Sequence, residues 1–332
     1  MPSIEPESAL TAVVAGILHN PQGRILVAQR PLHKHQGGKW EFPGGKIHPG
    51  EGVTAALSRE LHEELGIIVN GAQPFLRVRH AYPDKTVLLD IWRITDYTGE
   101  PQGREGQPLR WVSQDELAAL DLPDADVPVL RALKLPALYL ISDASRLGKN
   151  EFLDRMERAL SVGARMIQVR EPEMPAAEYR AFAKAVVSIA HRYGAKVILN
   201  ADPECVASCG ADGVHLNRQR LMKLQKRPLH ESLLVGASCH EPAELKQAAR
   251  IGADFSLLSP VRATASHPDR PGLGWIEFTR LRMFSDIPVY ALGGMHAEDL
   301  PDACAAGATG RAMIRGVWDS IPVEDAVKAM LI

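Results

Sequence analysis

The sequence has few cysteines, few aromatic residues, almost no net charge and no long apolar run. Its four cysteines, Cys205, Cys209, Cys239 and Cys304, lack the spacing of a disulfide framework or a zinc site, so we expect buried free thiols. No apolar segment approaches the roughly 20 residues of a membrane-spanning helix, and the first residues lack the basic and apolar regions of a signal peptide. We therefore expect a cytoplasmic protein without a membrane partner.

The balance of charge and the length of the chain narrow the possibilities further. The 332 residues include 38 basic and 40 acidic ones, which gives a net charge of −2. Proteins that bind duplex nucleic acid normally present a basic face to its phosphates, so we expect no duplex partner. A chain of this length also exceeds the size at which single hydrophobic cores stop growing, which favours two domains.

Acidic residues are concentrated between Gly45 and Ile67, where the sequence reads Gly-x5-Glu-x7-Arg-Glu-Leu-x-Glu-Glu-x-Gly-Ile. On a helix, Glu60, Glu63 and Glu64 would project from one face, where like charges repel unless a cation lies among them. Mg2+ prefers oxygen ligands and usually bridges protein carboxylates to substrate phosphates. The spacing therefore predicts a magnesium-pyrophosphate site, with a solvated acidic helix as the alternative.

Residues around this helix support the same interpretation. Glu51 can pair with Arg59 and orient the acidic cluster. Gly44 and Gly45 allow the backbone to approach a metal and phosphates closely, and Gly66 is expected to end the helix in a left-handed conformation.

With its flanking segments the motif is identified as a Nudix box, and residues 9–135 resemble Nudix hydrolases of the MutT type. The resemblance is carried by residues 40–47, 99–101, 105–108, Trp111 and 122–129. It implies an α/β/α sandwich with a mixed sheet for a domain of residues 1–135, and an enzyme that hydrolyses nucleoside triphosphates with Mg2+, for which Mn2+ can substitute.

The resemblance also implies roles for individual residues. The catalytic residues would be Arg59, Glu60, Glu63, Glu64 and Glu105. The metal would be held by Gly44, Glu60, Glu63, Glu64 and Glu105. The nucleotide would be held by Arg30, His35, Glu41, Phe42, Pro43, Gly44 and Asp126.

Asp126 departs from the MutT pattern, which has Asn at this position. An ionised aspartate only accepts hydrogen bonds, and the Watson–Crick edge of guanine offers two adjacent donors, N1–H and N2–H. We therefore expect Asp126 to favour guanine. The alternative is that Asp126 only caps the helix that follows.

Local patterns predict the secondary structure of this first domain. Strands are expected at residues 12–17 and 24–29, joined as a hairpin by a turn at residues 20–23, and again at residues 75–82 and 87–95. Helices are expected at residues 113–120 and 126–133. Lys134-Leu135-Pro136 ends the last helix, and we place the domain boundary after residue 135.

From residue 136 to residue 332 the pattern changes to short apolar runs that alternate with helical segments. The runs cover residues 138–141, 166–169, 197–199, 214–216, 233–235, 255–258, 289–292 and 311–314. Eight strands separated by helices predict a parallel (β/α)8 TIM barrel, with a doubly wound open sheet as the alternative.

In such a barrel the ligand site lies at the carboxyl ends of the strands. The candidate residues there are Arg170, Asn200, Ser238, His240, Thr264, Gly293, Gly294, Arg315 and Gly316. The glycines after the seventh and eighth strands predict a phosphate site, because they expose backbone N–H groups. The alternative is that these glycines serve packing only.

The second domain resembles the thiamine phosphate synthase and TenI tautomerase family through residues 168–171, 211–216, 236–240, 259–261 and 292–295. Ala201 and Arg220 stand where that family has metal-binding aspartates, and Pro172 and His267 stand where it has lysines. These departures argue against synthase activity, whereas His240 matches the catalytic histidine position of the tautomerases.

The leading hypothesis is a pyrophosphohydrolase that converts 8-oxo-dGTP to 8-oxo-dGMP and pyrophosphate, which would remove a mutagenic nucleotide before DNA replication. Its barrel would be a degenerate synthase that binds a small phosphorylated ligand. The alternative is a thiamine-related bifunctional enzyme. In that protein the Nudix domain would hydrolyse a thiamine pyrophosphate derivative, or regulate a barrel that is a synthase or a tautomerase.

Overall fold

The computed structural model describes residues 10–263 and 272–331. Contacts divide the chain into two compact units, the first ending at Lys134 and the second beginning at Leu135. Thr264 and His267, named above for the barrel, lie outside the described residues.

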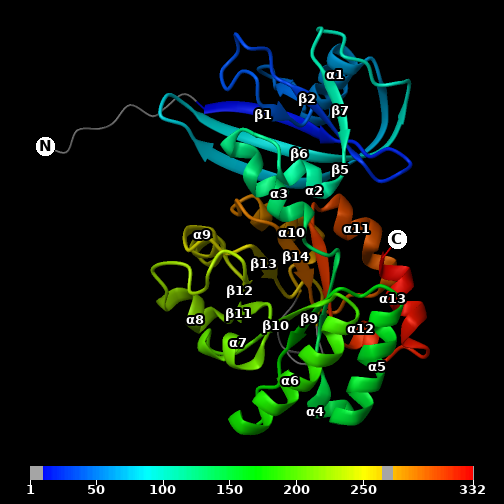
Figure 1. The fold of residues 1–332 in the computed structure, drawn as a ribbon, viewed down its shortest axis with the longest axis vertical. Coiled ribbons are helices and arrows are strands. Elements are labelled where there is room, and N and C mark those ends of the chain that lie inside the picture. The colour runs from blue at the N-terminus through cyan, green and yellow to red at the C-terminus, as the bar shows by residue number, and fades with distance from the viewer. Residues whose placement is uncertain (1–9, 264–271, 332) are drawn as a thin grey trace, which may run out of the picture. The chain divides into compact units, whose positions relative to one another are not determined.

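The first unit is built on two small sheets (Figure 1). Its elements are β1 (Leu10–Ile17), β2 (Ile25–Gln29), β3 (Trp40–Glu41), β4 (Gly44–Lys46), α1 (Val53–Leu65), β5 (Ile68–Ala81), β6 (Thr86–Thr98), β7 (Leu109–Val112), α2 (Gln114–Ala118), η1 (Asp124–Asp126) and α3 (Val127–Leu133). The larger sheet has the order β4-β1-β6-β5, with β1 and β6 parallel and the other pairs antiparallel. The smaller sheet has the order β3-β2-β7.

Helices cover both faces of the larger sheet. Alternate residues of β1 point to opposite sides, so Val14 belongs to the core with Leu57 and Leu61 of α1, whereas Ile17 belongs to the core with Val129 of α3. The predicted α/β/α sandwich with a mixed sheet is confirmed.

The predicted hairpin between the first two strands forms only at its closed end. A turn does form at Asn20, whose side chain accepts hydrogen bonds from the N–H groups of Gln22 and Arg24. Beside the turn, His19 and Ile25 form an antiparallel bridge, with the N–H of Asn20 donating to the carbonyl of Arg24 and the N–H of Leu26 to that of Leu18. The turn carries the chain from one sheet into the other, because β1 pairs with β4 and β6 while β2 pairs with β3 and β7.

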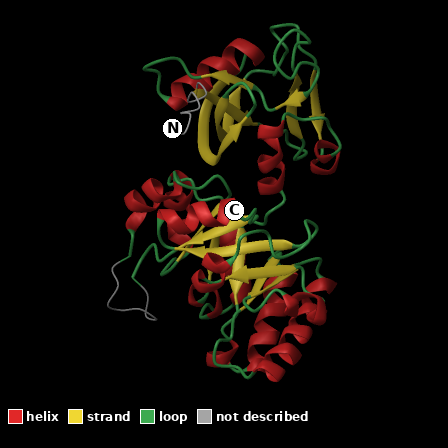
Figure 2. Ribbon diagram, turned by 90° about the vertical axis from the view of Figure 1, so that its left-hand side faces the viewer, coloured by secondary structure: helices red, strands yellow, loops and turns green. Residues whose placement is uncertain are grey.

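The second unit is a closed barrel of eight parallel strands (Figure 2). Its strands are β8 (Leu138–Ile141), β9 (Met166–Val169), β10 (Lys196–Leu199), β11 (Gly213–Leu216), β12 (Leu234–Cys239), β13 (Phe255–Leu258), β14 (Val289–Leu292) and β15 (Gly310–Met313). Its helices are α4 (Ala144–Leu147), α5 (Lys149–Ser161), α6 (Ala176–Arg192), α7 (Glu204–Cys209), α8 (Arg218–Lys223), α9 (Pro242–Arg250), α10 (Gly274–Arg282), η2 (Ala297–Asp299), α11 (Leu300–Ala305), α12 (Arg315–Trp318) and α13 (Val323–Leu331). The (β/α)8 prediction is confirmed, and the open-sheet alternative is wrong.

The barrel core explains why these strands appear in the sequence as continuous apolar runs. Every residue of β8, β9, β11, β13 and β15 is buried, since the outer helices cover one face and the barrel interior the other. Tyr139, Phe255 and Tyr290 fill the interior. All four cysteines are free, but only Cys209 and Cys239 are buried. Within the described residues, no helix is both long enough and apolar enough to cross a membrane.

Candidate functional site

Arg59 on α1 gathers the acidic side chains around it. Its guanidinium donates to both carboxylate oxygens of Glu51 at 2.8 and 2.9 Å, to Glu60 at 2.8 Å and to Glu63 at 3.2 Å. The hydrogen bonds from Arg59 lower the pKa of Glu51 to about 2. The predicted pairing of Glu51 with Arg59 is confirmed, and it fixes the face of α1 that carries the other carboxylates.

Glu64 lies where several negative charges meet. Its Oε2 accepts the N–H of Gly44 at 3.0 Å. Burial is the main cause that raises the pKa of Glu64 to about 8. The nearby charges of Glu41, Glu105 and Glu60 act in the same direction, and the hydrogen bond from Gly44 opposes them. Such a group of oxygen donors calls for a hard divalent cation, so the residues fit Mg2+.

Hydrogen bonds and an ion pair within the protein hold these carboxylates. Glu60 is bound to Arg59, Glu64 to the backbone of Gly44, and Glu105 to Lys34 at 3.5 Å. Among the described residues, no three acidic, histidine or cysteine side chains already surround one point closely enough to hold an ion. Glu63 stands apart, since 55% of its side chain is exposed and its only described hydrogen bond is to Arg59.

The loop that carries Glu105 is attached to the end of α1. The N–H of Gln102 donates to the carbonyl of Leu65 at 3.0 Å, and the N–H of Arg104 donates to the carbonyl of Glu64 at 2.9 Å. The side chain of Gln107 donates to the same Glu64 carbonyl and accepts the N–H of Glu105. Carbonyl groups that a helix end leaves unpaired thus position Glu105 beside Glu64.

Two glycines are required for different reasons here. A Cβ added to Gly45 would lie 2.2 Å from Oε2 of Glu60, so only glycine lets this carboxylate approach the β4 backbone. Gly66 has φ of 74° and its N–H donates to the carbonyl of His62, as predicted for the left-handed end of α1.

The predicted nucleotide residues form a second group, linked by Arg30. Its guanidinium pairs with Glu41 and also donates to the carbonyl of His35 at 2.9 Å. Phe42 is only 2% exposed and belongs to the core, while the Pro43 carbonyl accepts the N–H of Gly16. The side chain of Phe42 therefore packs in the hydrophobic core and supports the backbone of the neighbouring site residues.

Asp126 is almost fully buried at the start of α3, with an exposed fraction of 5%. Burial is the main cause that raises its pKa to about 8, with Glu41 acting in the same direction and Arg30 against it. The expectation of an ionised Asp126 is therefore corrected, because burial favours the protonated acid. The alternative role as a helix cap is also wrong, since its side chain makes no capping bond to α3.

Tyr82 is a contact residue that the sequence did not reveal. Its hydroxyl accepts the N–H of Ala125 at 3.3 Å, and its ring packs edge-on against His35 with ring centroids 5.1 Å apart. Tyr82 therefore joins the loop of His35 to the segment of Asp126. Its position at the end of an alternating strand gave no signal of this.

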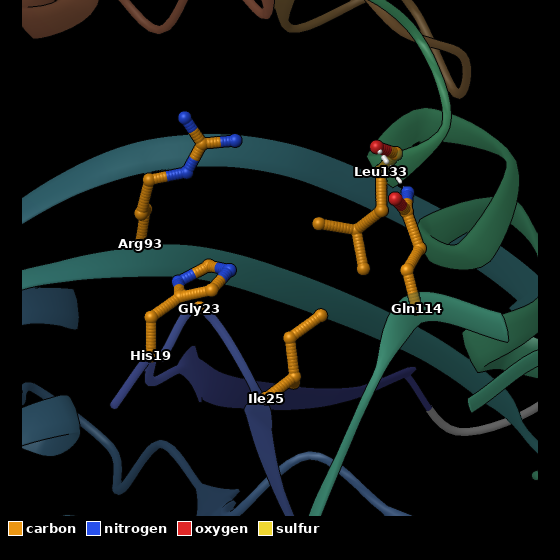
Figure 3. A pocket seen from close by; sticks show the side chains of 6 residues that line it. All are labelled: His19, Gly23, Ile25, Arg93, Gln114 and Leu133. Carbon is orange, nitrogen blue, oxygen red and sulfur yellow. Dashed lines mark hydrogen bonds between the residues drawn. The ribbon is translucent and has the colours of Figure 1, made fainter. Parts of the chain in front are cut away.

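A separate cavity of about 390 Å3 lies in the same unit (Figure 3). His19 and Arg93 face it from one side and Gln114 from the other. None of its lining residues belongs to the carboxylate group, so this cavity is distinct from the candidate catalytic site.

In the barrel, Asn200 and Ser238 are the ends of a hydrogen-bonded chain through the interior. Asn200 donates to Gln168 at 3.1 Å, Gln168 donates to the Tyr139 hydroxyl at 3.0 Å, and that hydroxyl lies 3.4 Å from Nδ1 of His215. Nε2 of His215 lies 2.9 Å from the Ser238 hydroxyl. Burial, together with Arg170, lowers the pKa of His215 to about 3, so this histidine is neutral.

The other barrel candidates lie at the same end of the strands. Arg170 and Arg315 are exposed. His240 is held at Nδ1 by the buried carboxylate of Glu244 at 3.1 Å.

Gly293, Gly294 and Gly316 of the barrel pack closely against neighbouring loops. A Cβ on Gly293 would lie 2.8 Å from Pro260, one on Gly294 would lie 2.7 Å from the Ala263 carbonyl, and one on Gly316 would lie 2.5 Å from the Met295 carbonyl. Close packing therefore favours glycine at all three positions, and the positive φ values of Gly293 (112°) and Gly294 (61°) add a second reason there.

Arg220, which the resemblance aligns with a metal-binding aspartate, takes part in an ion pair. Arg220 donates to Asp202 at 2.7 Å, and Asp202 is the neighbour of Ala201. A guanidinium therefore neutralises the carboxylate that remains at this place.

Comparisons with known proteins agree with this division. The sequence model described as "NUDIX domain" matches residues 14–132, and that described as "Thiamine monophosphate synthase" matches residues 138–317. The first unit is similar to the 8-oxo-dGTP diphosphatase of Escherichia coli (39% identity, 37% of this chain, 95% of the relative) and to its CTP pyrophosphohydrolase (40%, 36% and 88%).

The similarity to thiamine enzymes extends beyond the barrel. The thiamine-phosphate synthase of Gloeobacter violaceus is 32% identical over 283 residues, which cover 83% of this chain and 74% of the relative. The solved thiamine phosphate pyrophosphorylase of Pyrococcus furiosus superposes with a TM-score of 0.52 at 26% identity, over 60% of this chain and 95% of that one. The chain thus belongs to the Nudix family through its first unit and to the thiamine monophosphate synthase family through its second.

Proposed function

We propose that the first unit is a metal-dependent nucleoside triphosphate pyrophosphohydrolase whose main substrate is 8-oxo-dGTP, which it splits to 8-oxo-dGMP and pyrophosphate. The convergence of Glu41, Glu60, Glu64 and Glu105 is the observation that carries the proposal. A binding module that only senses nucleotides would not require this concentration of negative charge, which is costly without a cation.

One group of residues would hold the metal, and another would orient the nucleotide. Glu60, Glu64 and Glu105 would hold Mg2+, with Glu63 at the exposed edge of α1, and Arg59 would keep Glu60 in place. A bound Mg2+ would neutralise the phosphates and acidify a water molecule. Gly44 would offer a backbone group to the metal, and Arg30, His35, Glu41, Phe42 and Pro43 would form the wall that orients the nucleotide.

The protonation of Asp126 bears on the choice of base. An ionised Asp126 accepts two hydrogen bonds and matches the N1–H and N2–H donors of guanine, whereas a protonated one offers a donor beside an acceptor and also matches the N3 and N4 groups of cytosine. Similarity to both an 8-oxo-dGTP diphosphatase and a CTP pyrophosphohydrolase makes CTP the second candidate substrate. We favour 8-oxo-dGTP, because the two donors of its base would stabilise the carboxylate form.

Steady-state hydrolysis of a substrate panel by the full chain tests this function. We expect the highest kcat/KM for 8-oxo-dGTP, lower values for dGTP and CTP, and release of pyrophosphate. Faster hydrolysis of CTP would transfer the assignment to the second candidate. The panel includes thiamine pyrophosphate, since similarity to a thiamine-phosphate synthase extends beyond the barrel. Preference for that compound would establish the thiamine-related alternative, and no turnover at all would favour a regulatory role.

For the barrel, we propose that it binds a small phosphorylated ligand without making thiamine phosphate. The exposed Arg315, with Arg170 and Ser238 at the same end of the strands, would bind the phosphate. Synthesis is not expected, because Arg220 and Asp202 form an ion pair where a metal would be required, and a guanidinium there repels Mg2+.

Incubation of the full chain with thiazole phosphate, the pyrimidine pyrophosphate and Mg2+ checks this prediction. We expect no thiamine phosphate above background, but measurable binding of thiazole phosphate that Arg315→Ala weakens about fivefold or more. Robust synthesis would contradict the proposal and make the protein bifunctional.

A further inference from the structure

The loop between β2 and β3, residues 30–39, carries several basic side chains. Three of them have described acidic partners other than Glu105. Arg30 pairs with Glu41, His35 lies 3.8 Å from Asp84, and Lys39 lies 3.3 Å from Asp121. Lys34 is the exception.

Lys34 reaches across to the catalytic loop. Its Nζ lies 3.5 Å from Oε2 of Glu105, which is 71 residues further along the chain. Lys34 also lies close enough to Glu41 to lower that carboxyl's pKa, against the larger raising effect of burial. This ammonium group therefore lies beside two of the carboxylates that surround Glu64.

The ion pair between Lys34 and Glu105 is weak enough for another cation to replace Lys34. Both partners are about half exposed, at 46% and 47%, and ion pairs of that kind contribute little stability. A divalent cation at Glu105 would compete directly with the ammonium group. Once released, Lys34 remains tethered by a flexible stem beside the place where a metal would join carboxylates to a polyphosphate.

We propose that Lys34 is an exchangeable cation, which neutralises Glu105 in the free enzyme and moves to the phosphates of the nucleotide when Mg2+ takes its place. The inference rests on the proposed metal role of Glu105. It assigns to Lys34 two opposite effects, since the same charge opposes metal binding and favours substrate binding.

The test compares Lys34→Met with the wild-type full chain in two measurements. Binding of Mn2+ to the nucleotide-free protein, followed by the electron paramagnetic resonance of free Mn2+, should become about threefold tighter, because a competing cation is lost. The KM for 8-oxo-dGTP, or for whichever nucleotide is hydrolysed fastest, should rise about fivefold or more at saturating Mg2+, because a charged contact to phosphate is lost.

Two further variants serve as controls. Lys34→Arg retains the charge and should keep both constants near the wild-type values, and Lys39→Met removes a lysine of the same loop that pairs with Asp121. A change in only one of the two constants, or none, overturns the exchange. Mn2+ binding without any nucleotide hydrolysis would instead refute the proposed function, while a failure of Mn2+ binding in every variant would refute both.

Discussion

Glu60→Gln is expected to lower kcat for nucleotide hydrolysis by a factor of about 10^2 or more. Glutamine keeps the shape of the side chain but removes the negative charge that would hold Mg2+. Folding should be preserved, because Arg59 retains both of its hydrogen bonds to Glu51. The measurement is kcat at saturating Mg2+ and nucleotide, with thermal unfolding to verify the fold.

Glu100→Gln is the matched control, since Glu100 is exposed on the loop after β6. It should leave kcat unchanged. If Glu60→Gln retained a third or more of the wild-type kcat, the charge of Glu60 would not be part of catalysis.

The position of the Glu60 carboxylate can be tested without altering its charge. Gly45→Ala places a methyl group 2.2 Å from Oε2 of Glu60 and should displace it, with a loss of about tenfold or more in kcat. Gly52→Ala is the control, because nothing lies within 4 Å of a Cβ there and its φ of −74° suits alanine.

Asp126→Asn is expected to stabilise the first unit at pH 8 by about 2 to 5 kcal/mol and to have little effect near pH 4. The pKa of Asp126 is raised from 3.8 to about 8 in the folded protein, chiefly by burial. Folding therefore favours the protonated acid, and stability is lost as the pH rises from about 4 toward 8. Asparagine keeps the shape and cannot ionise, so the loss should disappear.

Urea unfolding between pH 5 and pH 8 measures this difference, with Trp40, Trp92 and Trp111 as fluorescent reporters in the first unit. Asp124→Asn is the control, because Asp124 lies on the same turn but is exposed. Stability curves of wild type and Asp126→Asn that remained parallel from pH 5 to pH 8 would show that Asp126 is not held as a neutral acid.

The sequence predicted the elements that depend on local pattern. The helix of the acidic motif, its glycine end at Gly66 and the Glu51–Arg59 pair all follow from short spacings along one segment. The barrel strands were predicted almost to the residue, because parallel strands buried on both faces form unbroken apolar runs. The predicted positions of the eight runs agree with β8 to β15 within about two residues at most ends.

Features that depend on distant segments were not predictable in this way. The predicted hairpin does not extend into β1 and β2, because a turn signal does not say which sheet the second strand joins. The charge state of Asp126 was wrong, because burial by other segments decides it. The roles of Tyr82 and Lys34 emerge only when loops 71 residues apart, such as those of Lys34 and Glu105, meet in space.

The attachment of the Glu105 loop to the last carbonyl groups of α1 makes the position of Glu105 sensitive to the length of this loop. Hydrogen bonds to one helix end hold the loop so that Glu105 lies near Glu64. A residue inserted between Gln102 and Glu105 is therefore expected to move the Glu105 carboxylate away from Glu64.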